Sequence, residues 1–298
     1  MTLAAAFAFA EARNVRCPEC GHPPAHVFRT RQEIAAQLAT RDAFFGRRLR
    51  DVTDVLLGTP SDILRCDACG ILVREDAPDD DAFSNDRYDT SVLESLHEVH
   101  AAAFRAKERD YRPLLRAGAR VVEVGSYVGG FLAAIREWGW DGIGVDIGRD
   151  ASGFSRDLGF DVRSHPFEQC GFARESFDAV FIWNCFEQLA TPRVTLAEAH
   201  RVLRPFGTLV VRVPDADFYA SCRSVAALAY NGLLGWPHRF GFDTSALRRL
   251  VAEHGFAVKR VLRAAAIGPL REEAACAPGW IEVVFRTVDA VGRSAWRR

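Results

Sequence analysis

The pattern of hydrophobic and polar positions between residues 118 and 214 predicts strands that alternate with helices. Between the first two apolar runs, apolar residues recur at helical spacing from Phe131 to Trp138, and residues 193–204 predict a further helix that Pro205-Phe206-Gly207 ends. Because strands that alternate with helices form parallel sheets, this region predicts an α/β domain. The apolar runs that predict its strands are 120–125, 142–145, 160–164, 177–183 and 208–213.

The chain on either side of this region continues the same pattern. Residues 91–115 show helical spacing, which predicts a helical cover before the first strand. Residues 244–254 predict a helix with Asp243 as its N-cap. The last two apolar runs, 256–262 and 280–288, predict a pair of strands joined as a hairpin.

A glycine-bearing turn follows the first predicted strand, and an acidic residue ends the second. Glu123 precedes the turn, Gly125 and Gly129 lie within it, and Asp146 ends the second strand. Ligands of open parallel sheets bind beyond the carboxyl ends of the strands, where glycines let the backbone approach and a carboxylate accepts hydrogen bonds from ribose. A dinucleotide site requires glycine where this chain has Tyr127. The turn therefore favours another nucleotide-like cofactor, with an ordinary strand–helix turn as the alternative.

The order of motifs between residues 120 and 214 resembles that of the class I S-adenosylmethionine (SAM)-dependent methyltransferases. Residues 123–129, EVGSYVG, are similar to their first motif, and residues 177–214 are similar to their later strand–helix–strand block. The residues that depart from the usual pattern are Tyr127, Gln188, Thr191 and Phe206. The resemblance implies an α/β fold with a Rossmann-like, seven-stranded methyltransferase sheet and helices on both faces.

The same resemblance implies which residues bind SAM. Asp146 is expected to hold the ribose, and Ile147 is expected to lie against the adenine. Because no acid follows the third predicted strand, Phe167 and backbone groups are expected to meet the adenine there. Three further residues are candidates for the SAM carboxylate, with solvated surface charge as the alternative: Tyr88, Arg105 and Lys107. The expected cofactor set is Glu123, Gly125, Tyr127, Gly129, Asp146, Ile147, Phe167 and Asn184.

Half of the 8 cysteines fall in two C-x-x-C-G pairs, which predicts a metal site. Two residues between cysteines let both thiolates reach one tetrahedral ion, and the glycine permits the tight turn. Four thiolates leave no open position, so the expected Zn²⁺ is structural. A redox pair, or reduced cysteines that bind nothing, are the alternatives. The expected ligands are Cys17, Cys20, Cys66 and Cys69.

Three segments are predicted: a zinc-binding module with a helical insertion at 1–78, a linker and helical cover at 79–117, and the methyltransferase domain at 118–298. Within the last, residues 215–242 form an aromatic-rich insertion that is expected to close over the methyl acceptor. A helical hairpin that caps the core is the alternative. Tyr219, Trp236 and His238 are expected to face the transferred methyl. His238 and Glu187 are the candidate general bases, with purely structural roles as the alternative.

Composition and charge narrow the class of acceptor. The net charge is −1, no apolar run is long enough to span a bilayer, and no basic residue precedes the apolar stretch 3–10, so a cytoplasmic protein is expected. The leading hypothesis is methylation of a small molecule, such as a sugar or a natural-product intermediate, because a zinc module before this core resembles bacterial sugar methyltransferases. RNA methylation is the alternative, since residues 41–50 are basic and aromatic, although the acidic linker argues against nucleic acid. A non-catalytic SAM-binding protein is the third reading. The sequence leaves the oligomeric state open.

Overall fold

The structure is a computed structural model that describes residues 16–17, 20–24, 26–33, 62–75, 88–216, 238–264 and 280–287. Internal contacts divide the chain into two compact units. One unit comprises Met1–Pro78 and Asp215–Leu247, and we call it the cysteine unit. The other comprises Asp79–Pro214 and Arg248–Arg298, and we call it the sheet unit.

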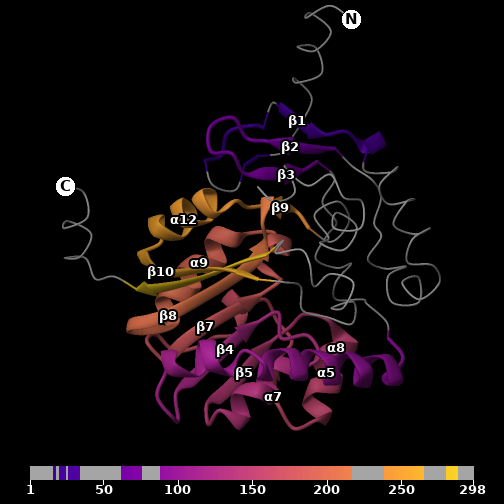
Figure 1. Cartoon of the computed structure of the whole chain (residues 1–298), viewed down its shortest axis with the longest axis vertical. Coiled ribbons are helices and arrows are strands. Elements are labelled where there is room, and N and C mark those ends of the chain that lie inside the picture. The colour runs from indigo at the N-terminus through magenta and orange to yellow at the C-terminus, as the bar shows by residue number, and fades with distance from the viewer. Residues whose placement is uncertain are drawn as a thin grey trace, which may run out of the picture. The chain divides into compact units, whose positions relative to one another are not determined.

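The sheet unit is built on a seven-stranded sheet of order β10-β11-β8-β7-β4-β5-β6 (Figure 1). The strands from β6 to β8 pair in parallel, whereas β11 pairs antiparallel with both of its neighbours. The bounds are β4 (Arg120–Val124), β5 (Asp141–Val145), β6 (Asp161–Arg163), β7 (Phe177–Trp183), β8 (Leu203–Pro214), β10 (Phe256–Ala264) and β11 (Trp280–Thr287). The predicted seven strands and the final hairpin are confirmed.

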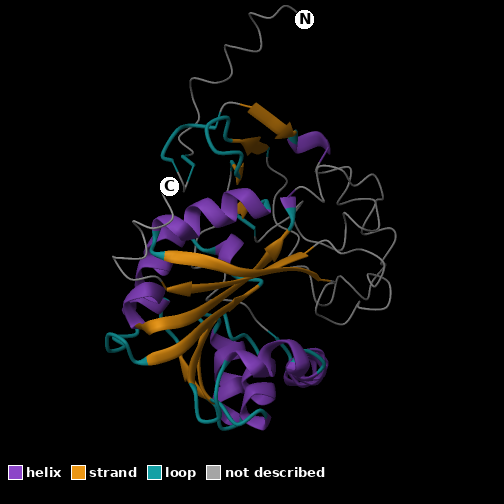
Figure 2. Cartoon of the chain, turned by 60° about the vertical axis from the view of Figure 1, so that its left-hand side comes forward, coloured by secondary structure: helices purple, strands orange, loops and turns teal. Residues whose placement is uncertain are grey.

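Helices lie on both faces of this sheet, as the sequence predicted (Figure 2). Asp243 caps α12 as expected, because its Oδ1 accepts a hydrogen bond from the Ala246 N–H at 2.7 Å. The helices are α5 (Thr90–Arg105), α6 (Glu108–Tyr111), α7 (Gly130–Glu137), α8 (Arg149–Asp157), α9 (Pro192–Val202) and α12 (Thr244–Glu253). Short 3₁₀ turns are η1 (Arg112–Leu114), η2 (Phe167–Gln169) and η3 (Phe186–Gln188).

Two element boundaries differ from the prediction. The helical cover predicted at 91–115 stops at Arg105 and resumes as α6 and η1. The break predicted at 205–207 lies inside β8, which starts at Leu203. Phe206 has a φ of 62°, and the β7–β8 register shifts beside this segment, so the tight turn takes the form of a bulge rather than a strand start.

Large aromatic side chains fill the core between the sheet and the cover. The ring centroids of Phe131 and Phe181 are 4.7 Å apart, and Phe104 packs on Phe131 at 5.1 Å. Each fully buried side chain of this size contributes about 1.5–3 kcal/mol. Helix α5 crosses the start of α7 so closely that a Cβ on Gly130 would lie 2.5 Å from the Cβ of His100. The core therefore fixes the cover against the sheet at the beginning of α7.

The cysteine unit contains a four-stranded sheet of order β1-β2-β3-β9, with antiparallel pairs. Its strands are β1 (His26–Arg29), β2 (Ile63–Arg65), β3 (Leu72–Arg74) and β9 (Phe240–Gly241). Asp215 pairs with Phe242, and the Ala216 N–H donates to the Phe242 carbonyl at 3.0 Å. The insertion that leaves β8 therefore returns as an edge strand of the cysteine unit. Residues 217–237 of the insertion lie outside the described residues. Most of the predicted helical insertion and most of the acidic linker lie outside them as well.

Candidate functional site

The glycine turn after β4 brings backbone close to the end of β7. Gly125 and Gly129 have φ values of 76° and 72°, a region that favours glycine. A Cβ on Gly125 would lie 2.6 Å from the Cβ of Cys185, so no larger residue fits there. The order of the strands reverses between β4 and β7, and such a switch point is where open α/β sheets bind their ligands.

Asp146, at the end of β5, fastens this turn. Its Oδ2 accepts the Tyr127 N–H at 2.7 Å, and its Oδ1 accepts the Gly148 N–H at 2.8 Å. The surrounding protein desolvates the carboxyl and raises its pKa, and the two hydrogen bonds oppose that rise. An ionised carboxylate offers about four acceptor positions, so two remain for hydroxyl groups. Asp146 and the partly exposed Ile147 are thus placed together at the carboxyl edge.

Two buried polar atoms lie unsatisfied around the turn. Glu123 Oε2 and Ser126 Oγ have no hydrogen-bond partner among the described residues, although both side chains are nearly fully buried. Burial first, and then Asp146, raise the pKa of Glu123 well above its ordinary value. A buried polar group normally finds a partner, so this pair fits a site that a polar cofactor completes.

Phe167 follows β6 at the same edge of the sheet. It lies in η2, is 3% exposed, and packs against Phe172 with ring centroids 6.1 Å apart. The two residues before it, His165 and Pro166, include no Asp or Glu. Its expected contact with adenine stays a prediction.

The candidates for the SAM carboxylate are placed differently from one another. Arg105 forms an exposed ion pair with Glu137 at 2.7 Å, and Lys107 donates to Glu282 at 2.5 Å. Tyr88 packs edge-on against Tyr127, with ring centroids 5.9 Å apart. The positive charges of Arg105 and Lys107 are therefore committed to other carboxylates, whereas Tyr88 lies against the turn.

Asn184 and Glu187 follow β7, across the switch point from the glycine turn. Asn184 has a φ of 52°, and its side-chain oxygen accepts a hydrogen bond from Arg212. Glu187 is 0% exposed, and burial raises its pKa to about 8. The sequence reasoning missed Arg212 and its partner Glu282. Each of these two residues is a charged residue inside an apolar run that predicts a strand. Because charged side chains are rarely fully buried unless they are paired, this pattern could have indicated a buried ion pair.

The four predicted metal ligands lie together in the cysteine unit. Their Sγ atoms fall within 4.8 Å of one another, with Cys17 and Cys69 3.1 Å apart and Cys20 and Cys66 3.4 Å apart. Both pairs form the same backbone turn. The Gly21 N–H donates to the Cys17 carbonyl at 3.0 Å, and the Gly70 N–H donates to the Cys66 carbonyl at 2.7 Å. Four converging thiols on two matching turns are the donor set that tetrahedral zinc prefers.

His238 lies in the cysteine unit, where it is 8% exposed. Burial first, and then the charge of Arg74, lower its pKa to about 3, so the imidazole is neutral over the physiological range. Tyr219 and Trp236, which are also expected to face the transferred methyl, lie outside the described residues.

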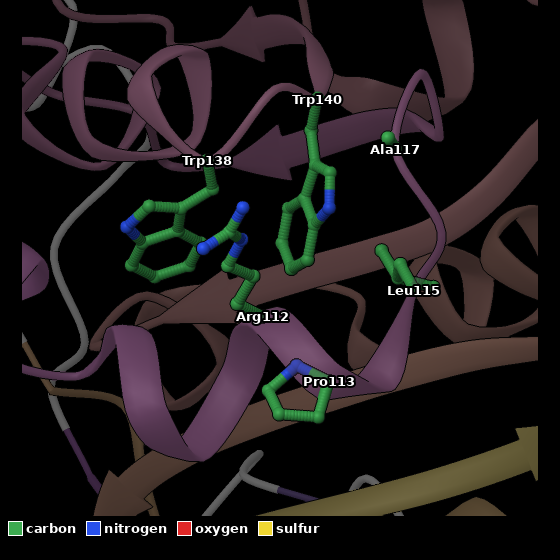
Figure 3. Close-up of a pocket in the computed structure, with 6 residues that line it drawn as sticks. All are labelled: Arg112, Pro113, Leu115, Ala117, Trp138 and Trp140. Carbon is green, nitrogen blue, oxygen red and sulfur yellow. The ribbon is translucent and has the colours of Figure 1, made fainter.

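A hollow of about 320 Å³ opens elsewhere in the sheet unit (Figure 3). Arg112 reaches toward the indoles of Trp138 and Trp140, and Pro113, Leu115 and Ala117 complete the lining. These residues directly precede β4 and β5, so the hollow lies at the amino ends of the strands. It is at the opposite edge of the sheet from the glycine turn and does not belong to the candidate site.

A family model described as a methyltransferase domain matches residues 94–261, more than half of the chain. The chain belongs to this methyltransferase family. No sequence among the curated proteins matches it significantly.

Solved structures agree with the fold. A chain in the complex between the Haloferax volcanii Trm112 methyltransferase activator and a methyltransferase is 19% identical, with a TM-score of 0.52; the match covers 67% of this chain and 92% of that one. A SAM-dependent methyltransferase from Archaeoglobus fulgidus is 18% identical, with a TM-score of 0.51, and the match covers 67% of this chain and all of that one. Among the described residues of this methyltransferase, no helix has the length and hydrophobicity to cross a membrane.

Proposed function

We propose that this methyltransferase moves the methyl group of SAM to a small-molecule acceptor. The observation that carries the proposal is the unsatisfied Glu123 Oε2 beside a turn whose glycine at 125 admits no side chain. An unsatisfied buried carboxyl oxygen beside the glycine turn suits a cofactor with an amino group and hydroxyls. Net charge of −1 supports a small acceptor over RNA, and the basic stretch 41–50 lies outside the described residues.

Every expected cofactor residue except Asn184 has a task in this proposal. Asp146 binds the ribose hydroxyls with the acceptor positions that Tyr127 and Gly148 leave open. Glu123 binds from beneath the turn, Gly125 and Gly129 give the turn its left-handed backbone, and Ile147 and Phe167 flank the adenine. SAM supplies a methyl group on a positively charged sulfur, and the protein positions the acceptor in line with it and excludes water.

Glu187 and His238 stay the predicted catalytic residues, and their protonation states suggest different tasks. Glu187 keeps its proton at neutral pH because its pKa is raised to about 8 by burial, so it donates a hydrogen bond rather than accepting a proton. The neutral His238 is the member of the pair that is able to accept one. The closure of residues 215–242 over the acceptor remains part of the proposal.

The four clustered cysteines are proposed to hold one structural Zn²⁺. Their thiolates would occupy all four positions of a tetrahedral ion, which leaves none for substrate. The metal would therefore stabilise the cysteine unit, including β9 at the end of the insertion, rather than take part in methyl transfer.

The experiment is calorimetric titration of SAM into the wild type and Asp146→Ala. We expect the variant to lose about 10- to 100-fold in affinity, as is usual for a hydrogen bond to a charged group. Asp141→Ala is the matched control, because Asp141 is an exposed acid at the other end of β5. Unchanged SAM affinity in Asp146→Ala, or no SAM binding by the wild type, would refute the proposal.

A further inference from the structure

A buried ion pair joins two neighbouring strands of the sheet unit beside the candidate site. Arg212 of β8 and Glu282 of β11 face each other, and their Nε and Oε1 atoms are 3.0 Å apart. The two side chains are 0% and 1% exposed. A buried charge is tolerated when it is paired and hydrogen-bonded, so removing either residue would leave the other as an unpaired buried charge.

The cover over the sheet supplies two more donors to Glu282. Lys107, between α5 and α6, donates to Oε1 at 2.5 Å, and the Tyr111 hydroxyl donates to Oε2. Burial raises the pKa of Glu282, but Arg212 and Lys107 outweigh it and hold the pKa below its ordinary value. Glu282 is thus an ionised carboxylate whose position is set from several sides.

Arg212 in turn decides which way the Asn184 amide faces. Its Nη1 donates to Asn184 Oδ1, and the Asn184 N–H donates to the Arg212 carbonyl at 3.1 Å. A guanidinium carries donors and no acceptor. The amide oxygen of Asn184 must therefore face Arg212, and its NH₂ group must face away.

Asn184 lies at the carboxyl end of β7, directly before the residue that packs against the glycine turn. Asn184 is partly exposed, and no residue in the described parts of the chain accepts a hydrogen bond from its Nδ2. Cys185, the next residue, is the one that leaves no room for a Cβ on Gly125. Asn184 Nδ2 is thus an oriented donor just after the end of β7, one residue before the contact between Cys185 and Gly125.

Two neighbouring titratable groups carry no charge at neutral pH. Glu187 holds a proton at neutral pH, and the charge of Arg212 acts on it. His100, 5.8 Å from Tyr127 between ring centroids, is neutral because burial, then Arg212 and His97, lower its pKa to about 4. A protonated amine would meet donors and a positive charge here, whereas an oxygen anion would meet complementary groups.

We propose that the methyl acceptor presents an anionic oxygen, of a carboxylate or an acidic phenol, to Asn184 Nδ2. Arg212 and Glu282 are positioning residues that act through Asn184. This inference rests on the proposed function and adds the chemical class of the acceptor; it assigns Asn184, which the sequence analysis placed in the cofactor set, to the acceptor instead. In the transfer, an oxygen lone pair bonds to the methyl carbon of SAM, the carbon–sulfur bond breaks, and its electron pair stays on sulfur. Because the oxygen is already ionised, no proton has to be removed, and with such an acceptor His238 is not needed as a general base.

The side-chain amide of Asn184 reports on this contact directly. Acetate, and methylammonium as its cationic counterpart, are titrated into the full chain saturated with S-adenosylhomocysteine and followed by ¹⁵N NMR. We expect acetate to move the Asn184 side-chain resonances and methylammonium to leave them in place. A shift on adding S-adenosylhomocysteine that acetate does not change further would assign the donor to the cofactor and overturn the proposal. No shift with either ion would overturn it as well.

Glu282→Gln tests the positioning role, with Glu137→Gln as the matched exposed control. We expect Glu282→Gln to weaken the acetate response of Asn184 by about tenfold or more, with S-adenosylhomocysteine affinity unchanged. Arg212→Lys, which keeps the charge but not the fork, serves if Glu282→Gln does not fold. An acetate response that equals the wild type in these variants would contradict the positioning role.

Product chemistry separates this inference from the proposed function. The chain is incubated with methyl-labelled SAM and a small-molecule cell extract, and the labelled products are isolated. We expect the label on oxygen, where carboxyl esters release it as methanol in mild alkali. Label on nitrogen or carbon would overturn the oxygen acceptor and leave methyl transfer standing. Tight SAM binding without any labelled product would overturn the proposed function, and this inference with it.

Discussion

The described parts of the two units of this methyltransferase differ in strand length and in side-chain packing. The sheet unit has strands of up to 12 residues and a core of packed aromatic rings. The strands of the cysteine unit have 2 to 4 residues, and β1 has exposed or half-exposed side chains throughout. A small unit buries too little apolar surface to offset the entropy of folding, and metals or other cross-links commonly supply the difference. The described part of the cysteine unit has the four clustered thiols together with a small set of buried apolar side chains, among them Leu64 and Leu72.

Burial has the same electrostatic effect in both units. It disfavours the charged form, so it raises the pKa of Glu187 in the sheet unit and lowers that of His238 in the cysteine unit. Both predicted catalytic residues are therefore neutral at pH 7. Glu187 then has a proton to donate, whereas His238 has a lone pair that accepts one. The pH dependence of turnover therefore distinguishes the two residues.

Zinc removal should show the largest difference between the units. Structural zinc contributes about 10–16 kcal/mol to the folding of small zinc modules, so its loss should unfold the cysteine unit while the sheet persists. We expect one zinc per chain by metal analysis, and loss of exchange protection at β9 before β7 after chelation. Cys66→Ser should lose the zinc, whereas Cys170→Ser, outside the cluster, should keep it. Full metal retention in Cys66→Ser would contradict the assignment.

A substitution in the sheet unit should destabilise that unit and leave the zinc in place. Phe181→Ala empties a site that is 0% exposed and packed between Phe131 and Trp183, which should cost about 3–5 kcal/mol of unfolding free energy. Denaturant unfolding measures it, and the zinc content should not change. Phe206→Ala, at a side chain 65% exposed, should cost no more than about 0.5 kcal/mol. Equal losses in the two variants would mean that the aromatic core does not dominate this unit.

The smallest effect expected is the pH dependence that Glu187 brings. With a pKa of about 8, it loses its proton between pH 7 and pH 9, so turnover that needs its donated hydrogen bond should fall about tenfold over that range. Glu187→Gln keeps a donor and should flatten the profile. A rise in turnover through pH 8 would instead make Glu187 the general base.

The stability of the fold should respond to the same proton. Native Glu187 keeps its proton up to about pH 8, whereas the unfolded chain releases it near the ordinary value of 4.5. The native state therefore binds more protons between these values. This contribution to stability is complete below about pH 4.5 and is lost as the pH rises through 8. Glu187→Gln should remove this part of the pH dependence in denaturant unfolding.

Local sequence pattern determined much of this protein. Apolar runs located β7 and β5 to within a residue, because buried strands must be continuous and hydrophobic. The spacing of Gly125, Gly129 and Asp146 located the glycine turn and the carboxylate that holds it at the switch point of the sheet, because few residues tolerate that backbone or supply that carboxylate. The C-x-x-C-G pairs predicted the cysteine cluster, since both halves repeat the same turn.

Contacts between distant parts of the chain were decided by the tertiary structure alone. Lys107 and Glu282 are 175 residues apart, and Arg212 and Glu282 are 70 apart, so no local period signals that they meet. The pairing of β9 with β3 likewise joins the returning insertion to the cysteine unit. The local sequence pattern indicates which face of a helix or strand is buried. Which residue lies opposite on the neighbouring strand depends on strand order and register. The orientation of Asn184 depends on that partner, and it is therefore a property of the folded sheet.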